Sequence, residues 1–172
     1  SRAKRICTHA DPASLLACDA AEPFIEYARE HSRDARASFA VSGSGGLPVR
    51  TGGYGSVSSL LVLNFLPDSD AAVQEMRSLT SPQGIVSACI WDYGEGMEFL
   101  RYFWDTAAAL DEAARGLHEG ARFPLCHRDA LSDLFHQGGL RDVRRLRAAF
   151  PAFHRSSVQR RAEHGHLPAD HV

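Results

Sequence analysis

The sequence lacks long apolar runs and has almost no excess of either charge. No segment approaches the ~20 apolar residues that a helix needs to cross a bilayer. The basic residues that follow Ser1 are not continued by the apolar stretch of a signal peptide. A formal net charge of -2 gives the chain no general attraction to nucleic acid or to anionic membranes. We therefore expect a cytoplasmic protein whose partners include neither a membrane nor a nucleic acid.

Cysteine is scarce, and no two cysteines form a Cys-x-x-Cys pair. The four are Cys7, Cys18, Cys89 and Cys126. This spacing excludes a zinc ribbon and a dithiol redox motif. Cys18 and Cys89 lie within apolar runs, which predicts buried, reduced thiols. Three of the nine histidines gather near the C-terminus, but no cysteine or carboxylate joins them at the spacing of metal ligands, so we predict no metal site.

The length and composition are those of one globular domain. With 172 residues, 44% hydrophobic and 23% charged, the chain can bury a core of its own. We predict a domain over residues 1–153 and a polar, disordered tail over 154–172. Seven arginines between residues 141 and 161 are opposed only by Asp142. They form either a basic patch or a solvated part of the tail.

Segments with the pattern of buried strands alternate with amphipathic helical segments. Residues 13–19 form an apolar run that ends in Asp19, and Pro23 then occupies the first turn of a predicted helix that continues to about Ser32. Residues 37–41 alternate as a second strand, and a loop rich in glycine follows over 42–48.

The pattern then repeats. We predict a strand over 57–64, a helix that Asp68 or Ser69 caps, a turn over 81–84 and a strand over 85–91. The inner face of that helix is predicted to hold Ala72, Val73, Met76 and Leu79. Strand, helix and strand in this order indicate a parallel sheet whose ligands bind outside the carboxyl ends of the strands.

Two more helices are predicted farther along the chain. The first runs over about residues 97–115, and its many aromatic and apolar residues predict burial on more than one side. The second runs over 128–137 and stops at Gly138 and Gly139. Residues 144–153 fit either a strand or a helix.

Five blocks of sequence occur in an order that is typical of one family. They are CDAAEPFIEYAR at 18–29, FAV at 39–41 with GLP at 46–48, LVLNFLPD at 61–68, EMR at 75–77 with SPQG at 81–84, and WDY at 91–93. Together they resemble the class I S-adenosylmethionine-dependent methyltransferases, in particular the small-molecule branch similar to methyltransferase type 11 domains. The resemblance implies a Rossmann-like, three-layer α/β sandwich with a mostly parallel sheet.

The resemblance also implies a set of site residues. Asp19 matches the acid that binds the ribose hydroxyls of the cofactor, and Ala20 follows it beside the adenine. Asn64 and Phe65 match the wall beside the methionine moiety and the methyl group. The substrate side is matched by Trp91, Asp92 and Tyr93. Each has a plainer alternative: Asp19 as a helix cap, Asn64 as a strand end, and the last three as core packing with a turn acid.

The chain departs from the family in three places. The glycine-rich loop of the family lies about 20 residues before the ribose acid, yet residues 1–12 contain no glycine. Gly43 and Gly55 stand where the family has acids, and residues 155–172 lack its last strands. We therefore expect a sheet that is incomplete at its N-terminal and C-terminal strands, and weakened cofactor binding. Two hypotheses remain: methyl transfer to a small molecule, or a non-catalytic remnant that acts through protein contacts such as homodimerisation.

Overall fold

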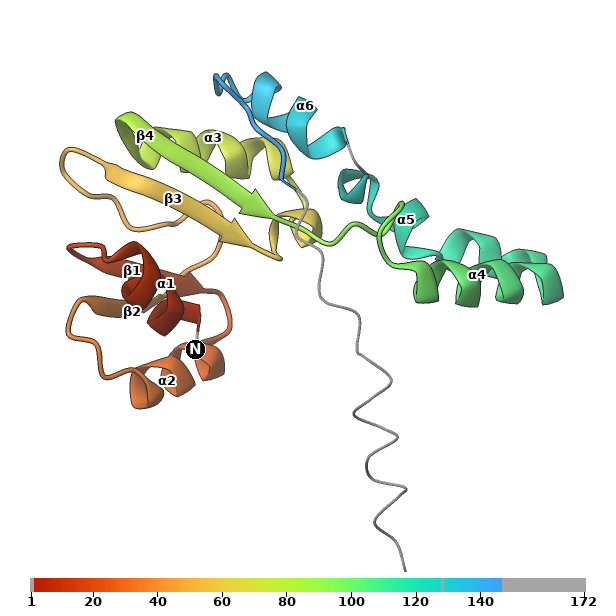
Figure 1. The fold of residues 1–172 in the computed structure, drawn as a ribbon, viewed down its shortest axis with the longest axis horizontal. Coiled ribbons are helices and arrows are strands. Elements are labelled where there is room, and N and C mark those ends of the chain that lie inside the picture. Colours follow the sequence, from red (N-terminus) through yellow and green to blue (C-terminus); the bar gives the residue numbers. More distant parts are fainter. Residues whose placement is uncertain (1, 128, 147–172) are drawn as a thin grey trace, which may run out of the picture.

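The computed structural model describes residues 2–127 and 129–146, in which helices alternate with parallel strands (Figure 1). The predicted tail and most of the predicted element over 144–153 lie outside these residues. The larger elements are α1 (Arg2–Ala10), β1 (Leu15–Asp19), α2 (Glu22–His31), β2 (Ala37–Val41), β3 (Tyr54–Leu60), α3 (Ser69–Leu79), β4 (Thr80–Cys89), α4 (Glu98–Leu110), α5 (Glu119–Arg122) and α6 (Ala130–Gln137). Three 3-10 helices complete them: η1 (Leu63–Phe65), η2 (Glu112–Leu117) and η3 (Pro124–Cys126).

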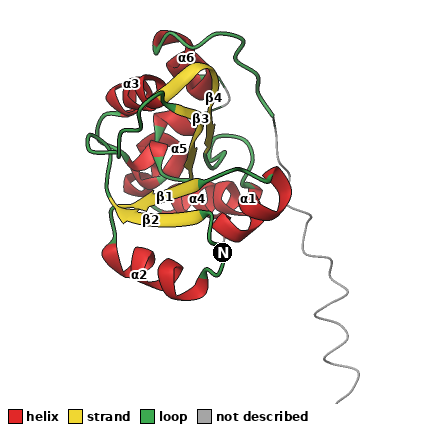
Figure 2. Ribbon diagram, turned by 90° about the vertical axis from the view of Figure 1, so that its left-hand side faces the viewer, coloured by secondary structure: helices red, strands yellow, loops and turns green. Residues whose placement is uncertain are grey.

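The strands form two separate parallel pairs. β1 pairs with β2, with Leu15 opposite Ala37, and β3 pairs with β4. Helix α2 contacts β1 and β2, whereas α3 contacts β3 and β4. Both views show the two pairs in one molecule, with α2 and α3 at different ends of the arrangement (Figures 1 and 2). The predicted α/β architecture with parallel, incomplete sheets is confirmed.

The first strand pair forms where it was predicted, but the helix before it was not predicted. Ala3 and Cys7 are one turn apart on α1, and both are buried. Arg36 connects α1 to the sheet, because its guanidinium donates to the Cys7 carbonyl at 3.2 Å and to the Asp34 carboxylate at 2.8 Å. Asp11 accepts a third bond from Arg36.

The predicted strand over 57–64 was wrong at its end. β3 runs from Tyr54 to Leu60 because Leu61, with φ of 58°, turns the chain into the left-handed region. Asn64 consequently lies in η1 rather than in a strand. The predicted turn at 81–84 interrupts the β3–β4 register, whose partners pass from Tyr54 and Thr80 to Ser56 and Ile85.

Helix α3 buries the face that its periodicity predicts. Ala72, Val73, Met76 and Leu79 are all buried, and the Asp68 carboxylate caps the helix by accepting the Ala71 N–H at 2.8 Å. A hydrophobic cluster joins this face to the neighbouring elements. Its buried members are Leu63, Ala72, Val73, Leu134 and Phe135.

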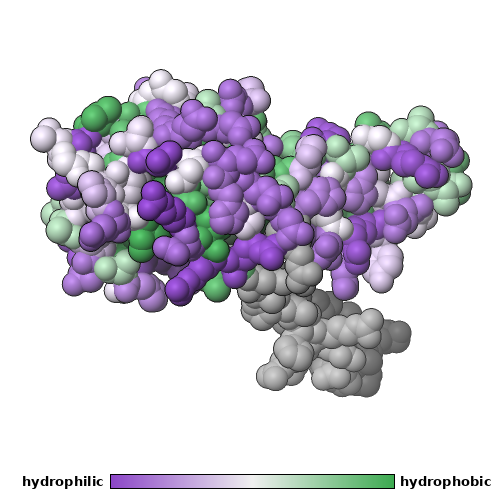
Figure 3. Space-filling model, turned by 90° about the horizontal axis from the view of Figure 1, so that it is seen from above, coloured by the Kyte–Doolittle hydropathy of each residue, from purple (hydrophilic) through white to green (hydrophobic). Residues whose placement is uncertain are grey.

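The expected burial of the following helix was wrong. α4 ends at Leu110, and it has no buried residue; Phe99, Tyr102, Phe103 and Leu110 are among its exposed side chains. Figures 1 and 3 show the reason: the segment with α4 projects from the rest of the described part of the chain, whose other elements leave its outer face uncovered. Among residues 2–127 and 129–146, no helix has the length and apolar character that crossing a membrane requires.

Two leucine truncations test this assignment of the core. Leu63 is 0% exposed and Leu110 is 86% exposed. We expect Leu63→Ala to lower the free energy of unfolding by about 2–5 kcal/mol, because it leaves a cavity in the core. The same change at Leu110 should alter it by less than about 0.5 kcal/mol. Urea denaturation of both variants measures the difference, and equal losses would contradict the assignment.

Candidate cofactor and substrate site

Asp19 and Ala20 lie at the carboxyl end of β1, beside the end of β2. The Asp19 carbonyl accepts the Ser42 N–H at 3.0 Å, which aligns the two strand ends. The Asp19 Oδ1 accepts the Ala21 N–H at 2.9 Å. Ala21 is itself the N-cap residue of α2, and no side chain caps that helix. The Oδ2 atom of Asp19 accepts no hydrogen bond from a described residue, so a carboxylate oxygen is available to a ligand hydroxyl.

Asn64 has a buried amide without hydrogen-bond partners. The residue is 8% exposed, and neither its Oδ1 nor its Nδ2 bonds to any described residue. A buried polar group without a partner costs about 1–3 kcal/mol. Such groups in native proteins indicate a ligand, an ion or a water that completes them. The amide therefore marks a position where a bound polar molecule would be stabilised.

Aromatic rings connect the next predicted cofactor residue to the predicted substrate side. Phe65 meets Phe123 edge to face, with ring centroids 5.1 Å apart, and Phe123 lies 5.9 Å from Tyr93. Rings in these arrangements attract one another beyond the area they bury. Phe65 is nevertheless 52% exposed, so the cluster presents an aromatic surface next to Asn64.

Asp92 and Tyr93 lie near the buried thiol of Cys126. The Gly94 N–H donates to the Cys126 carbonyl at 3.2 Å, which holds this segment on η3. Burial, and after it the Asp92 carboxylate, raises the pKa of Cys126 to about 11. Burial is also the main cause that raises the pKa of Tyr93, followed by Cys126 and Glu119. Trp91 is half-buried just before them.

The expected burial of two cysteines was wrong. Cys89 is exposed and Cys18 is only half-buried, because strands in a two-stranded sheet leave much of their surface open. Cys7 and Cys126 are the buried thiols. All four are free.

The loop after β2 is held by one acid of α3. Glu75 accepts the Gly45 N–H at 2.7 Å and the Leu47 N–H at 3.0 Å. The loop and the start of α3 enclose a cavity of about 420 Å³. Because a carboxylate already occupies these backbone donors, the loop does not offer them to a phosphate.

The structure thus brings some of the predicted residues together and leaves others apart. Phe65 and Tyr93 meet through Phe123, a residue that the sequence did not single out. No hydrogen bond or ring contact among the described residues joins Asp19 or Ala20 to Asn64. Cys126 was missed as well, and a short apolar run between Arg122 and His127 was its only local signal. Within residues 2–127 and 129–146, no three side chains are arranged to hold a metal ion.

Comparison with known proteins places this arrangement among methyltransferases. The profile of a family described as "Methyltransferase domain" matches residues 2–88. A solved complex between the Haloferax volcanii Trm112 methyltransferase activator and a protein assigned as a methyltransferase is similar in fold, with a TM-score of 0.60 and 13% identity. The match covers 80% of this chain and 55% of that chain. No curated protein matches.

A substitution at Asn64 tests whether its amide is held for a ligand rather than for the fold. Asn64→Leu removes both unpartnered polar atoms, so we expect the free energy of unfolding to rise by about 1 kcal/mol or more in the absence of ligand. Gln74→Leu makes the same amide-to-leucine change on the exposed face of α3 and should shift it by less than about 0.5 kcal/mol. A loss of stability in Asn64→Leu, measured by denaturation, would show that the amide is satisfied.

Alkylation tests the environment of Cys126. Only the thiolate reacts, so a pKa near 11 should protect Cys126 from iodoacetamide at about pH 8 and allow modification only as the pH approaches that value. Exposed Cys89 serves as the internal control and should react at the lower pH. Mass spectrometry of the peptides measures both sites, and equal rates at about pH 8 would contradict the described burial.

Proposed function

The chain belongs to the methyltransferase domain family, and from this we propose that it transfers a methyl group from S-adenosylmethionine to a small molecule. The family supports methyl transfer in general. The cofactor and the acceptor are our inference from the residues at the ends of β1 and β3. The solved relative supports only the fold, and this chain spans 55% of it.

The unpartnered amide of Asn64 carries the proposal. It lies in η1, directly after the strand that the resemblance places beside the methyl donor, and both of its polar atoms are buried without partners. S-adenosylmethionine carries amino, carboxylate and hydroxyl groups that can complete such an amide. Groups of this chemistry are the hydrogen-bond partners that the amide lacks.

Asp19 supplies the second polar contact in the proposed site. Its Oδ1 is fixed by the Ala21 N–H, which leaves Oδ2 to accept a bond from a ribose hydroxyl. Ala20 is exposed next to it, and the loop residue Gly43 is close enough that a Cβ there would lie 3.6 Å from the Ala20 Cβ. Two small residues leave a flat surface on which the adenine can lie.

The aromatic cluster defines the side on which the acceptor binds. S-adenosylmethionine, when bound, supplies an activated methyl group on a sulfonium, so the protein needs no nucleophile of its own. Phe65, Phe123 and Tyr93 form an aromatic surface next to Asn64 on which an apolar part of the acceptor can pack. Trp91 and Asp92 directly precede Tyr93, and we assign them to the same side of the proposed site. The protein's contribution is to orient the two molecules in line.

Protein binding is the second candidate function. The outer face of α4 exposes Phe99, Tyr102, Phe103 and Leu110, and exposed apolar side chains that cluster in this way mark interaction surfaces. The solved relative is part of a complex with an activator protein. A non-catalytic role, through an activator-like partner or a homodimer, would use this face without the cofactor.

Calorimetric titration with S-adenosylmethionine and S-adenosylhomocysteine tests the cofactor site. We expect both to bind, and we expect Asp19→Asn to weaken them about tenfold, as the loss of one charged hydrogen bond of about 1.5 kcal/mol predicts. Glu26→Gln, which changes an exposed acid on α2, is the control and should bind normally. Absence of binding up to about 1 mM would favour the non-catalytic function.

A further inference from the structure

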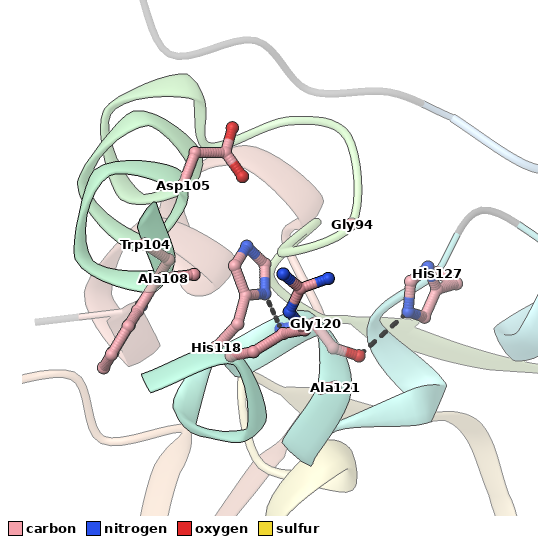
Figure 4. Close-up of a pocket in the computed structure, with 9 residues that line it drawn as sticks. Gly94, Trp104, Asp105, Ala108, His118, Gly120, Ala121 and His127 are labelled. Carbon is pink, nitrogen blue, oxygen red and sulfur yellow. Dashed lines mark hydrogen bonds between the residues drawn. The ribbon is translucent and has the colours of Figure 1, made fainter. Parts of the chain in front are cut away.

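A second cavity lies beyond β4, between α4 and α5. Its volume is about 410 Å³, within the range of small-molecule sites. Figure 4 shows Asp105 and Trp104 on one side of it, and His118 and Gly120 on the other. Gly94, one residue after Tyr93 of the predicted substrate side, also lines this cavity.

His118 presents a hydrogen-bond donor to this cavity. Its Nδ1 accepts the Gly120 N–H at 2.8 Å, so in the neutral ring the proton is on Nε2. In Figure 4 this second nitrogen is on the side of the ring that faces Asp105. Gly120 allows the arrangement, because a Cβ there would lie 2.9 Å from the His118 ring. His118 is the N-cap residue of α5.

Trp104 forms a fixed apolar wall. Its Nε1–H donates to the Glu119 carboxylate at 2.5 Å, which fixes the ring and uses its only polar atom. The small residue Ala108 also lines the cavity and leaves room in front of it. A flat or apolar group of a ligand can therefore pack on the indole.

The lining also contains one anion and one cation. Asp105 has no hydrogen bond or ion pair with any described residue. Arg115 forms an ion pair with Glu112, in which Nε and Oε1 approach to 3.4 Å, and its guanidinium donates no hydrogen bond to a described residue. Both side chains reach solvent, and 71% of the Arg115 side chain is exposed. A ligand with one charge alone can pair with only one of the two side chains. A ligand that carries both charges satisfies both side chains.

We propose that this cavity binds a small zwitterion of the amino-acid type. Its ammonium group pairs with Asp105, its carboxylate with Arg115 and the Nε2–H of His118, and its side chain packs on Trp104. The identification of this ligand with the methyl acceptor rests on the proposed function. Binding itself does not, and it is measured here without cofactor.

The probes are L-phenylalanine, 2-phenylethylamine, which lacks the carboxylate, and 3-phenylpropionate, which lacks the ammonium group. In calorimetric titration of the full chain we expect L-phenylalanine to bind at least about tenfold more tightly than either analogue. Asp105→Asn and Arg115→Gln should each remove that advantage. Glu26→Gln and Arg33→Gln change exposed charges outside the cavity and should preserve it.

Three results would overturn the inference. They are no binding of L-phenylalanine up to about 10 mM, equal or tighter binding of either analogue, and unchanged binding in folded Asp105→Asn and Arg115→Gln. Circular dichroism establishes that the variants are folded. If L-phenylalanine binds while S-adenosylmethionine does not, the proposed function fails and the cavity assignment stands. If S-adenosylmethionine binds while L-phenylalanine does not, the cavity assignment fails and the proposed function stands.

Discussion

The candidate site depends on the packing of Leu63 in the hydrophobic core. This side chain is 0% exposed and packs in one cluster with Val73 of α3 and with Leu134 and Phe135 of α6. Because Leu63 is anchored inward on a tight 3-10 turn, the next residue, Asn64, is drawn below the surface with its amide unpaired. Core packing thus supplies free energy that can offset the cost of an unsatisfied amide.

A different interaction organises the first strand pair. A two-stranded parallel sheet is a weak unit alone, and here Arg36 ties it to α1. Its hydrogen bonds to Asp34 hold the pKa of that carboxyl well below its usual range. The sign is that of a depressed acid: the stabilisation is present above the ordinary carboxyl pKa and is lost as the pH falls below it.

The two halves of the chain contribute different parts of the proposed chemistry. The family match over residues 2–88 contains both strand pairs except Cys89, the last residue of β4, and it contains the four predicted cofactor residues. The cavity between α4 and α5 lies beyond that match. A shared half that holds a common cofactor, joined to a variable half that selects the acceptor, is how one fold serves many reactions. The exposed face of α4 leaves this second half open to a protein partner as well.

Much of the local structure was determined by the sequence itself. The period of Ala72, Val73, Met76 and Leu79, the cap at Asp68 and the stop at Gly138 depend on residues within a few turns of one another, so they could be predicted. α1 was not predicted because most of its residues are polar, and only Ala3 and Cys7 among them are buried.

Tertiary structure alone decided the site. Nothing near Leu61 in the sequence indicated its positive φ, which moved Asn64 out of the predicted strand. The apolar pattern of α4 predicted burial, but whether an apolar face is covered depends on which elements reach it. The rings of Phe65 and Phe123 are in contact although they are 58 positions apart in sequence, and Trp104 donates a hydrogen bond to Glu119. Such pairings arise from the packing of whole elements, which local periodicity does not specify.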